Sequence, residues 1–206
     1  MLHLVDHPVA HDILIQLRDV ATEPERFRAL AGRISLLLAA EALRSLPAID
    51  TAVTTPLGPA EGRRLASDVV FVPVLRAGLG MLPGMLQVLP SARVGHIGLQ
   101  RDEETAVASR YYAKLPPGLE HSHVVLIDPM LATGGSAVAA LDLLTRAGAR
   151  RLSLVCIVAA PEGVAAVEAA YPDVAIVTPV VDRELNDRKF IVPGLGDFGD
   201  RLYGTT

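Results

Sequence analysis

Residues 128–136, which read DPMLATGGS, combine side-chain types that could hold a phosphorylated sugar. They follow a short apolar run, and a helical pattern begins near Ser136. The first N–H groups of a helix have no intrahelical partners and its dipole is positive there, so anions bind at that end. Gly134 and Gly135 leave room for a close approach to the backbone. Because Thr133 and Ser136 add hydroxyl donors, we predict a phosphate-binding loop.

Asp128 at the start of this loop extends the chemistry to a sugar. Its carboxylate would repel an adjacent phosphate, but it would accept hydrogen bonds from vicinal hydroxyls. A ligand such as ribose 5-phosphate, with phosphate at one end and hydroxyls at the other, meets both requirements. A helix cap and a turn would explain the TGG string alone, and Asp128 after an apolar strand favours phosphate binding. The loop carries neither a dinucleotide fingerprint nor a Walker sequence.

A second turn, Arg76-Ala77-Gly78, follows the apolar run at 69–75. A guanidinium at a strand end can bind an anion through several N–H groups, and small residues after it let the backbone come close. Taken by itself, the turn is explained equally well by a solvated loop charge.

Short apolar runs alternate with helical patterns along most of the chain and would position both turns. We expect a helix from about 136 to 147 and strands at 69–75, 93–99, 123–127, 152–159 and 174–181. This alternation predicts an α/β fold with a parallel sheet and helices on both faces. Ligands in such sheets bind past the carboxyl ends of the strands, where both turns lie.

The N-terminal part has a different pattern. Thr22 is expected to cap a helix whose apolar residues recur at helical spacing from Phe27 to Leu38, and Pro47 ends it. Residues 48–66 are mixed and contain several Pro and Gly, which indicates a loop or short strands.

Composition limits the classes of function. The chain has 206 residues and a net charge of −4, with half of its residues apolar. Its length fits a single domain over 1–206. It contains neither a run of ~18 apolar residues nor a signal-peptide pattern, so we expect a cytoplasmic protein that does not associate with membranes. Without a basic cluster, nucleic-acid binding is disfavoured. The single Cys156 lies in an apolar strand and is expected to be a buried thiol.

Several longer motifs accompany these turns in a fixed order. They are VPVLRAGLGM at 72–81, PSAR at 90–93, RDEET at 101–105, AAPEG at 159–163 and PGLGD at 193–197, followed by GDRLYGT. Together with DPMLATGGS they resemble the uracil phosphoribosyltransferases, members of the type I phosphoribosyltransferases, over nearly the whole chain. The resemblance implies a mostly parallel twisted sheet flanked by helices. It also implies a flexible hood at 100–120 and a C-terminal base-binding segment at 182–206.

The resemblance implies a reaction of pyrimidine salvage. Uracil N1 would displace diphosphate from 5-phosphoribosyl 1-diphosphate, giving UMP through a state with oxocarbenium character at ribose C1. Mg²⁺ would accompany the reaction, held mainly by the diphosphate of the substrate. A GTP effector and a homodimer or higher homo-oligomer are further expectations.

The same resemblance assigns roles to residues of this sequence. Arg76, Asp128 and Asp197 are the catalytic candidates, and Asp197 would steer the proton of uracil N1. The predicted uracil contacts are Ile191, Gly196, Asp197 and Phe198. The predicted contacts to the phosphoribosyl donor are Arg76, Ala77, Gly78, Arg101, Asp128, Pro129, Met130, Leu131, Ala132, Thr133, Gly134, Gly135, Ser136 and Asp197. A surface ion pair with the neighbouring acids is the competing explanation for Arg101.

Three departures from the family pattern concern the hood and the base site. Residues 108–110 read ASR before Tyr111-Tyr112, where relatives often carry prolines, so the hood should be looser. Lys189-Phe190 stands where Gly-Tyr is usual, and Phe198 where Ala is usual. The Phe198 ring could stack near the base, narrow the pocket, or point away into a small core.

Two other functions remain open from the sequence. One is a non-catalytic nucleotide-sensing regulator on the same fold, and the other is a transferase for another nucleobase, which Phe198 makes plausible. Four polar residues, Asp182, Arg183, Asn186 and Asp187, are most simply explained as a polar turn.

Overall fold

The computed structural model describes residues 1–101 and 108–205, with the backbone alone for residues 100, 101 and 108–110. Its central sheet has the strand order β1-β12-β10-β8-β4-β6-β7, and β5 also pairs with β4. All pairs are parallel except β6 with β7. The strands are β1 (Leu2–Leu4), β4 (Val69–Leu75), β5 (Arg93–Val94), β6 (His96–Arg101), β7 (Ala108–Lys114), β8 (His123–Ile127), β10 (Arg151–Val155) and β12 (Ala175–Thr178).

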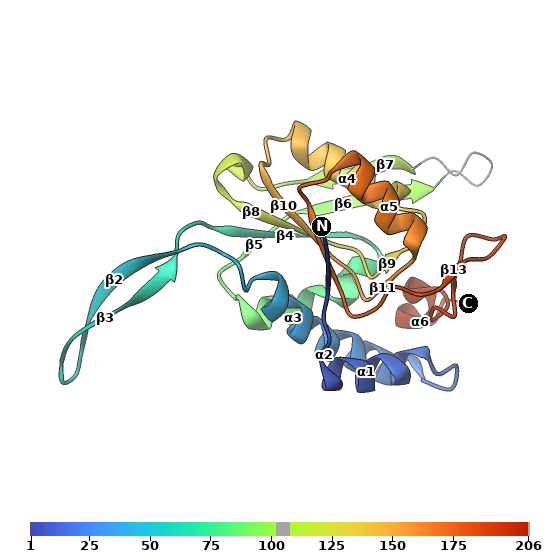
Figure 1. Cartoon of the computed structure of the whole chain (residues 1–206), viewed down its shortest axis with the longest axis horizontal. Coiled ribbons are helices and arrows are strands. Elements are labelled where there is room, and N and C mark those ends of the chain that lie inside the picture. The colour runs from blue at the N-terminus through green and yellow to red at the C-terminus, as the bar shows by residue number, and fades with distance from the viewer. Residues whose placement is uncertain (102–107, 206) are drawn as a thin grey trace.

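Helices cover both faces of this sheet, as Figure 1 shows. One face carries α1 (Pro8–Arg18), α2 (Pro24–Ala42) and α3 (Leu82–Val88), and the other carries α4 (Gly135–Arg146) and α5 (Pro161–Ala170). A short helix, α6 (Phe198–Tyr203), packs beside α2 near the C-terminus. The predicted α/β fold class is therefore confirmed.

Strand β4, and β8 after its first residue His123, are apolar because both of their faces are covered. Along β4, Val69 and Phe71 pack under the α1–α2 layer, while Val70 and Val72 pack under α4. All four side chains are buried, and each contributes about 1.5–3 kcal/mol to folding relative to exposure. This double burial holds the ends of β4 and β8 rigidly in place.

The chain changes direction across the sheet at β4. After β4 the chain adds β6 and β7 on one side, and it then returns to place β8 on the other side of β4. A crevice forms at the carboxyl edge of a sheet where such a reversal occurs, and ligands bind there. The loops after β4 and β8 therefore lie next to each other at the expected binding edge.

A two-stranded antiparallel arm projects from the body of the protein (Figure 1). It consists of β2 (Ala48–Thr55) and β3 (Gly58–Leu65), and most of its side chains are exposed. The sequence predicted a loop or short strands over 48–66, and the strands are longer than expected, with eight residues each. Pro and Gly near the tip weakened the strand pattern, and the two strands pair with each other rather than with the central sheet.

The start of α2 also differs from the expectation. The residue before its first turn is Glu23 rather than Thr22. The hydroxyl of Thr22 instead donates a hydrogen bond of 2.6 Å to the carbonyl oxygen of Gln16 in α1. The Thr22 hydroxyl is thus used in a contact with α1 and does not cap α2.

Within the two described stretches of the chain, no helix is both long and apolar enough to cross a membrane.

Cys156 should be chemically inert in the folded protein. Its side chain is fully buried, and this burial raises the pKa of the thiol to about 12. Because the thiolate is the reactive form, we expect a thiol-reactive chromogenic disulfide at pH 8 to label the protein only after denaturant is added. Rapid stoichiometric labelling of the native protein would contradict the described burial, and Cys156→Ala gives the zero-label baseline.

Candidate active site

The loop between β8 and α4 has the geometry of an anion site. Gly134, with φ 81°, precedes the first turn of α4, and its carbonyl accepts the first intrahelical bond from Val138 at 2.9 Å. The N–H groups of residues 135–137 therefore face out of the helix end, where the dipole is positive. Thr133 Oγ1 accepts a 3.4 Å hydrogen bond from the N–H of Gly135, which shapes the turn.

A small hollow of about 50 Å³ lies inside this loop. It is lined by Asp128, Met130, Leu131, Ala132, Thr133, Gly134, Ser136 and Ala137. Most of the predicted donor-binding residues of the loop thus surround one space, while Gly135 is exposed beside it. The Asp128 carboxylate accepts a hydrogen bond from the N–H of Met130 at 3.4 Å, so it is oriented at the entrance of the loop.

The turn after β4 packs directly against the end of β8. The Leu75–Arg76 peptide is cis, and a short 3₁₀ turn, η1 (Ala77–Gly80), follows. A Cβ atom at Gly78 would lie 2.6 Å from the carbonyl oxygen of Ile127 and 2.9 Å from the Pro73 side chain. Only glycine permits this approach, which brings the two predicted anion-binding turns together.

Arg76 is held at the mouth of this turn by the C-terminal helix. Its side chain is 59% exposed, and Nη2 lies 3.6 Å from the Asp200 carboxylate. The guanidinium also lies 5.7 Å from the centre of the Tyr203 ring, whose hydroxyl donates to the Arg76 carbonyl at 3.3 Å. These contacts keep the cation near the edge of the sheet while leaving much of it accessible.

The C-terminal segment forms an irregular loop before α6. β13 (Glu184–Leu185) pairs antiparallel with β14 (Ile191–Val192), and a cis Val192–Pro193 bond follows. Asp197 then caps α6, accepting a 2.9 Å hydrogen bond from the N–H of Asp200. Such a backbone can present N–H and C=O groups to the edge of a planar ligand.

One cavity of about 280 Å³ joins the three segments. Ala77 comes from the β4 turn, and Met130 and Ala132 come from the β8 loop. The opposite wall comprises Arg188, Lys189, Phe190, Ile191, Gly196, Asp197, Phe198 and Gly199. All four predicted uracil contacts therefore lie across one space from predicted donor-binding residues.

The two aromatic residues that depart from the family pattern, Phe198 and Phe190, differ in their exposure to solvent. Phe198 is only 1% exposed, and its ring packs edge-on against Phe27 of α2 with centroids 5.0 Å apart. The ring therefore adopts the third of the orientations considered above, in which it points into the core. Phe190 instead remains 46% exposed at the cavity. Lys189 has φ 64°, a left-handed conformation that favours the glycine usual at this position.

The predicted hood is described only in part. Residues 102–107 and the side chains of 100–110, including that of Arg101, lie outside the described residues. The described backbone makes β6 and β7 an antiparallel ribbon, and Tyr111 packs its ring over Gly98. The Tyr111 ring thus packs on the neighbouring strand while remaining largely exposed.

Three charged residues near the C-terminal segment were missed. Asp182, expected in a simple polar turn, is buried and pairs with Arg18. Arg201 lies over the Phe27 ring at 4.5 Å and donates to the carbonyl of Leu195. Burial lowers the pKa of its guanidinium from the ordinary value. Arg18 and Asp182 are 164 positions apart, so no local pattern could have paired them.

The string GLGDFG at 194–199 has the spacing of a dinucleotide fingerprint. In the structure it begins after the two-residue β14, and its last two residues, Phe198 and Gly199, already belong to the six-residue α6. A true fingerprint links a strand to the crossover helix of a βαβ unit. The string therefore does not form a dinucleotide site.

The mostly parallel sheet with helices on both faces has the type I phosphoribosyltransferase fold. A solved hypoxanthine-guanine phosphoribosyltransferase from Bacillus anthracis shares this fold, with a TM-score of 0.52 at 10% identity over 77% of this chain and 80% of that one.

Closer relatives identify the family. The sequence profile described as uracil phosphoribosyltransferase matches residues 4–205, so the chain belongs to the uracil phosphoribosyltransferase family. The uracil phosphoribosyltransferase of Dictyoglomus turgidum is 51% identical over 100% of both chains. That of Symbiobacterium thermophilum is 51% identical over 98% of this chain and 97% of its own. The structure of the AQ2163 protein from Aquifex aeolicus superposes with a TM-score of 0.96 at 39% identity, covering 100% of this chain and 99% of that one.

The close approach at Gly78 should be intolerant of a side chain. We expect Gly78→Ala to lower the free energy of unfolding by about 1–3 kcal/mol, as overpacking does. Gly32→Ala in α2 is the matched control, because its Cβ would meet nothing within 4 Å. The control should instead stabilise the helix by about 0.5–1 kcal/mol. Urea titrations of both variants measure the difference, and equal stabilities would show that the two turns do not press together.

Proposed function

We propose that this protein transfers the phosphoribosyl group of 5-phosphoribosyl 1-diphosphate to uracil N1, forming UMP and diphosphate. The observation that carries the proposal is the cavity shared by Ala77, Met130, Ala132 and the uracil-contact segment. A transferase must hold its donor and acceptor in contact, and a single space between their two predicted sites allows this. The names of the family's members agree with the reaction.

The donor is proposed to bind across the two turns. Its 5′-phosphate would occupy the hollow of the β8–α4 loop, where N–H groups at the start of α4 and the hydroxyls of Thr133 and Ser136 can donate. Asp128, at the start of the same loop, would accept hydrogen bonds from the ribose hydroxyls. We retain Pro129, Met130, Leu131, Ala132, Gly134 and Gly135 as its further contacts.

The leaving diphosphate is proposed to lie against the β4 turn. It gains negative charge as the bond to ribose C1 breaks, so donors fixed in advance stabilise the transition state more than the ground state. Arg76 is the described cation at this position, and the backbone of Ala77 and Gly78 is close by. Arg101 is retained as a second diphosphate ligand.

Uracil is proposed to be recognised by main-chain groups between Ile191 and Phe198. Its edge alternates acceptor, donor and acceptor, and a backbone loop can match that order. Cytosine would leave buried groups unpaired, which gives strong discrimination. Asp197, in the same wall, is the candidate for steering the N1 proton. The Phe198 ring lies in the core, so it offers no support for a transferase of another base.

The residues present fit a magnesium ion that arrives with its substrate. Mg²⁺ commonly takes one or two carboxylates together with substrate phosphates and water. In the part of the chain that the structure describes, no three His, Cys, Asp or Glu side chains cluster to make a metal site. Asp128 and Asp197 are the carboxylates of the proposed site, and the diphosphate would supply most ligands. When bound, the ion would neutralise charge on the leaving group.

Other expectations remain proposals. We propose that residues 1–206 act as one domain, with residues 100–120 as hood and 182–206 as base-binding segment. A cytoplasmic location, a homodimeric or larger assembly and regulation by GTP are proposed from the family resemblance.

A base-selection assay tests the function. The protein is mixed with Mg²⁺, 5-phosphoribosyl 1-diphosphate and one free base at a time, and the nucleotides are separated by chromatography. We expect UMP from uracil alone. Donor binding without turnover would support the regulator instead, and a different nucleotide would support a transferase for another base.

Arg76 should affect turnover more than stability. We expect Arg76→Ala to lower the rate of UMP formation by roughly 10²-fold or more, as loss of a preorganised cationic donor does. Its melting temperature should stay near that of the wild type, since exposed ion pairs contribute little. Arg33→Ala, which removes an exposed arginine of α2, is the control. Wild-type turnover in the Arg76 variant would remove this residue from the site.

A further inference from the structure

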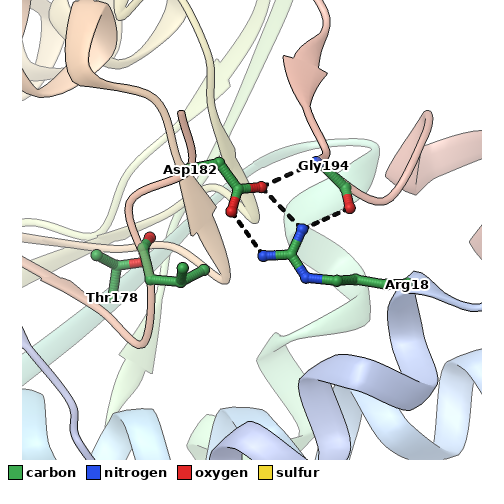
Figure 2. Close-up of polar contacts among 5 residues, drawn as sticks. Arg18, Thr178, Asp182 and Gly194 are labelled. Atoms are coloured by element: carbon green, nitrogen blue, oxygen red, sulfur yellow. Dashed lines mark hydrogen bonds and ion pairs between the residues drawn. The ribbon is translucent and has the colours of Figure 1, made fainter. Parts of the chain in front are cut away.

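An ion pair behind the base-binding loop connects it to the N-terminal helix, as Figure 2 shows. Arg18, in the last turn of α1, donates from Nη2 to Asp182 Oδ1 at 2.7 Å and from Nη1 to Oδ2 at 2.8 Å. The side chains are 16% and 5% exposed. Asp182 is also held through its backbone, because its N–H donates to the carbonyl of Ala159 at 2.8 Å.

Both members of the pair also bind the backbone of Gly194 (Figure 2). Arg18 Nη1 donates to the Gly194 carbonyl at 2.7 Å, and the Gly194 N–H donates to Asp182 Oδ2 at 2.9 Å. These two groups belong to successive peptide units, so the pair sets the orientation of both. Hydrogen bonds to charged groups are roughly twice as strong as neutral ones, which makes this a firm attachment.

A third peptide unit is held by Arg201. Its Nη1 donates to the Leu195 carbonyl at 2.8 Å, and its Nη2 donates to the Asp19 carbonyl at 2.6 Å. Nη1 also donates to the carbonyl of Leu17. A cation is favourable at the C-terminal end of a helix such as α1. Three consecutive peptide units, from residue 193 to residue 196, are therefore fixed from behind.

The fixed stretch also passes so close to Ile191 that only glycine fits at position 194. Gly194 has φ 57°, and a Cβ atom there would lie 2.2 Å from the Ile191 carbonyl oxygen. The turn thus folds back on Ile191 and leads directly to Gly196, which are both predicted uracil contacts. The described lining of the cavity includes these two residues, while Arg18 and Asp182 stand outside it.

We propose that the Arg18–Asp182 ion pair is a positioning device for base recognition. It holds the backbone between Ile191 and Gly196 in the arrangement that reads the edge of uracil, without touching the base. The inference rests on the proposed function and adds specificity-determining residues to it. A buried ion pair is weak evidence for stability, because desolvation offsets its attraction. Its bonds to Gly194 carry the inference, because they attach both charged groups to the backbone of the base-binding segment.

Steady-state kinetics of Arg18→Lys test this role. Lysine keeps the positive charge but cannot make the forked contact to Asp182 and also bind Gly194. We expect the KM for uracil to rise about tenfold or more, which corresponds to one lost charge-assisted hydrogen bond. The KM for 5-phosphoribosyl 1-diphosphate should stay within about twofold, because the donor turns are held by other contacts.

The matched control is Arg44→Lys. Arg44 makes a comparable forked contact to Glu41, at 2.8 and 2.5 Å, but lies on the exposed surface after α2. Both KM values should be unchanged in this variant. A double variant, Arg18→Met with Asp182→Leu, replaces the pair by apolar side chains that can restore folding. It should still show the selective rise, because Gly194 has lost both partners.

The ratio of the two KM values decides the outcome. A folded variant of the pair that keeps the wild-type ratio would overturn the inference, whatever happens to its melting temperature. A wild-type protein that forms no UMP would overturn the proposed function and this inference with it. Normal wild-type activity with an unchanged ratio in the variants would overturn the inference alone.

Discussion

The contact between the β4 turn and the end of β8 is the constraint on which the rest of the site depends. Two parallel strands, buried on both faces, end side by side at the point where the sheet reverses its strand order. Gly78 then lets the turn press against the Ile127 carbonyl. The N-terminal end of α4 and the cationic turn therefore face one crevice. Their spacing is set by the core rather than by the loops themselves.

The C-terminal segment is held in place by hydrogen bonds to charged side chains. The turns after β4 and β8 are instead held in place by apolar packing of the strands that precede them. Residues 193–200 form little regular structure, so they cannot rely on a ladder of backbone hydrogen bonds. Arg201 and the Arg18–Asp182 pair supply partners for carbonyl and N–H groups instead. Asp200 in turn reaches Arg76 of the donor side. The same short stretch thus contacts α1, α2 and the β4 turn, and it closes the cavity by joining parts of the chain that are distant in sequence.

Phe198 shows how a large ring is accommodated in the wall of the cavity. A large ring replaces the small residue usual in the family, directly beside Asp197. It is accommodated because α6 turns the side chain toward Phe27, where it adds apolar contact to the α2 layer. Lys189 is the opposite case, since it keeps a left-handed backbone conformation without the glycine that adopts it most easily.

The sequence by itself determined the fold class and the family. Both follow from local signals, namely apolar strands of five to seven residues followed by Gly-rich turns, and motifs in a fixed order. These signals can be interpreted without knowing which distant residues are in contact. The tertiary structure alone decided the direction of the Phe198 ring, the pairing of Asp182 with Arg18, and the length of the β2–β3 arm. Each of these depends on groups far apart in the chain, or on strands pairing outside the main sheet, and no local periodicity encodes them. The cavity is likewise a tertiary property, because its walls come from segments over a hundred residues apart, such as those containing Ala77 and Ile191.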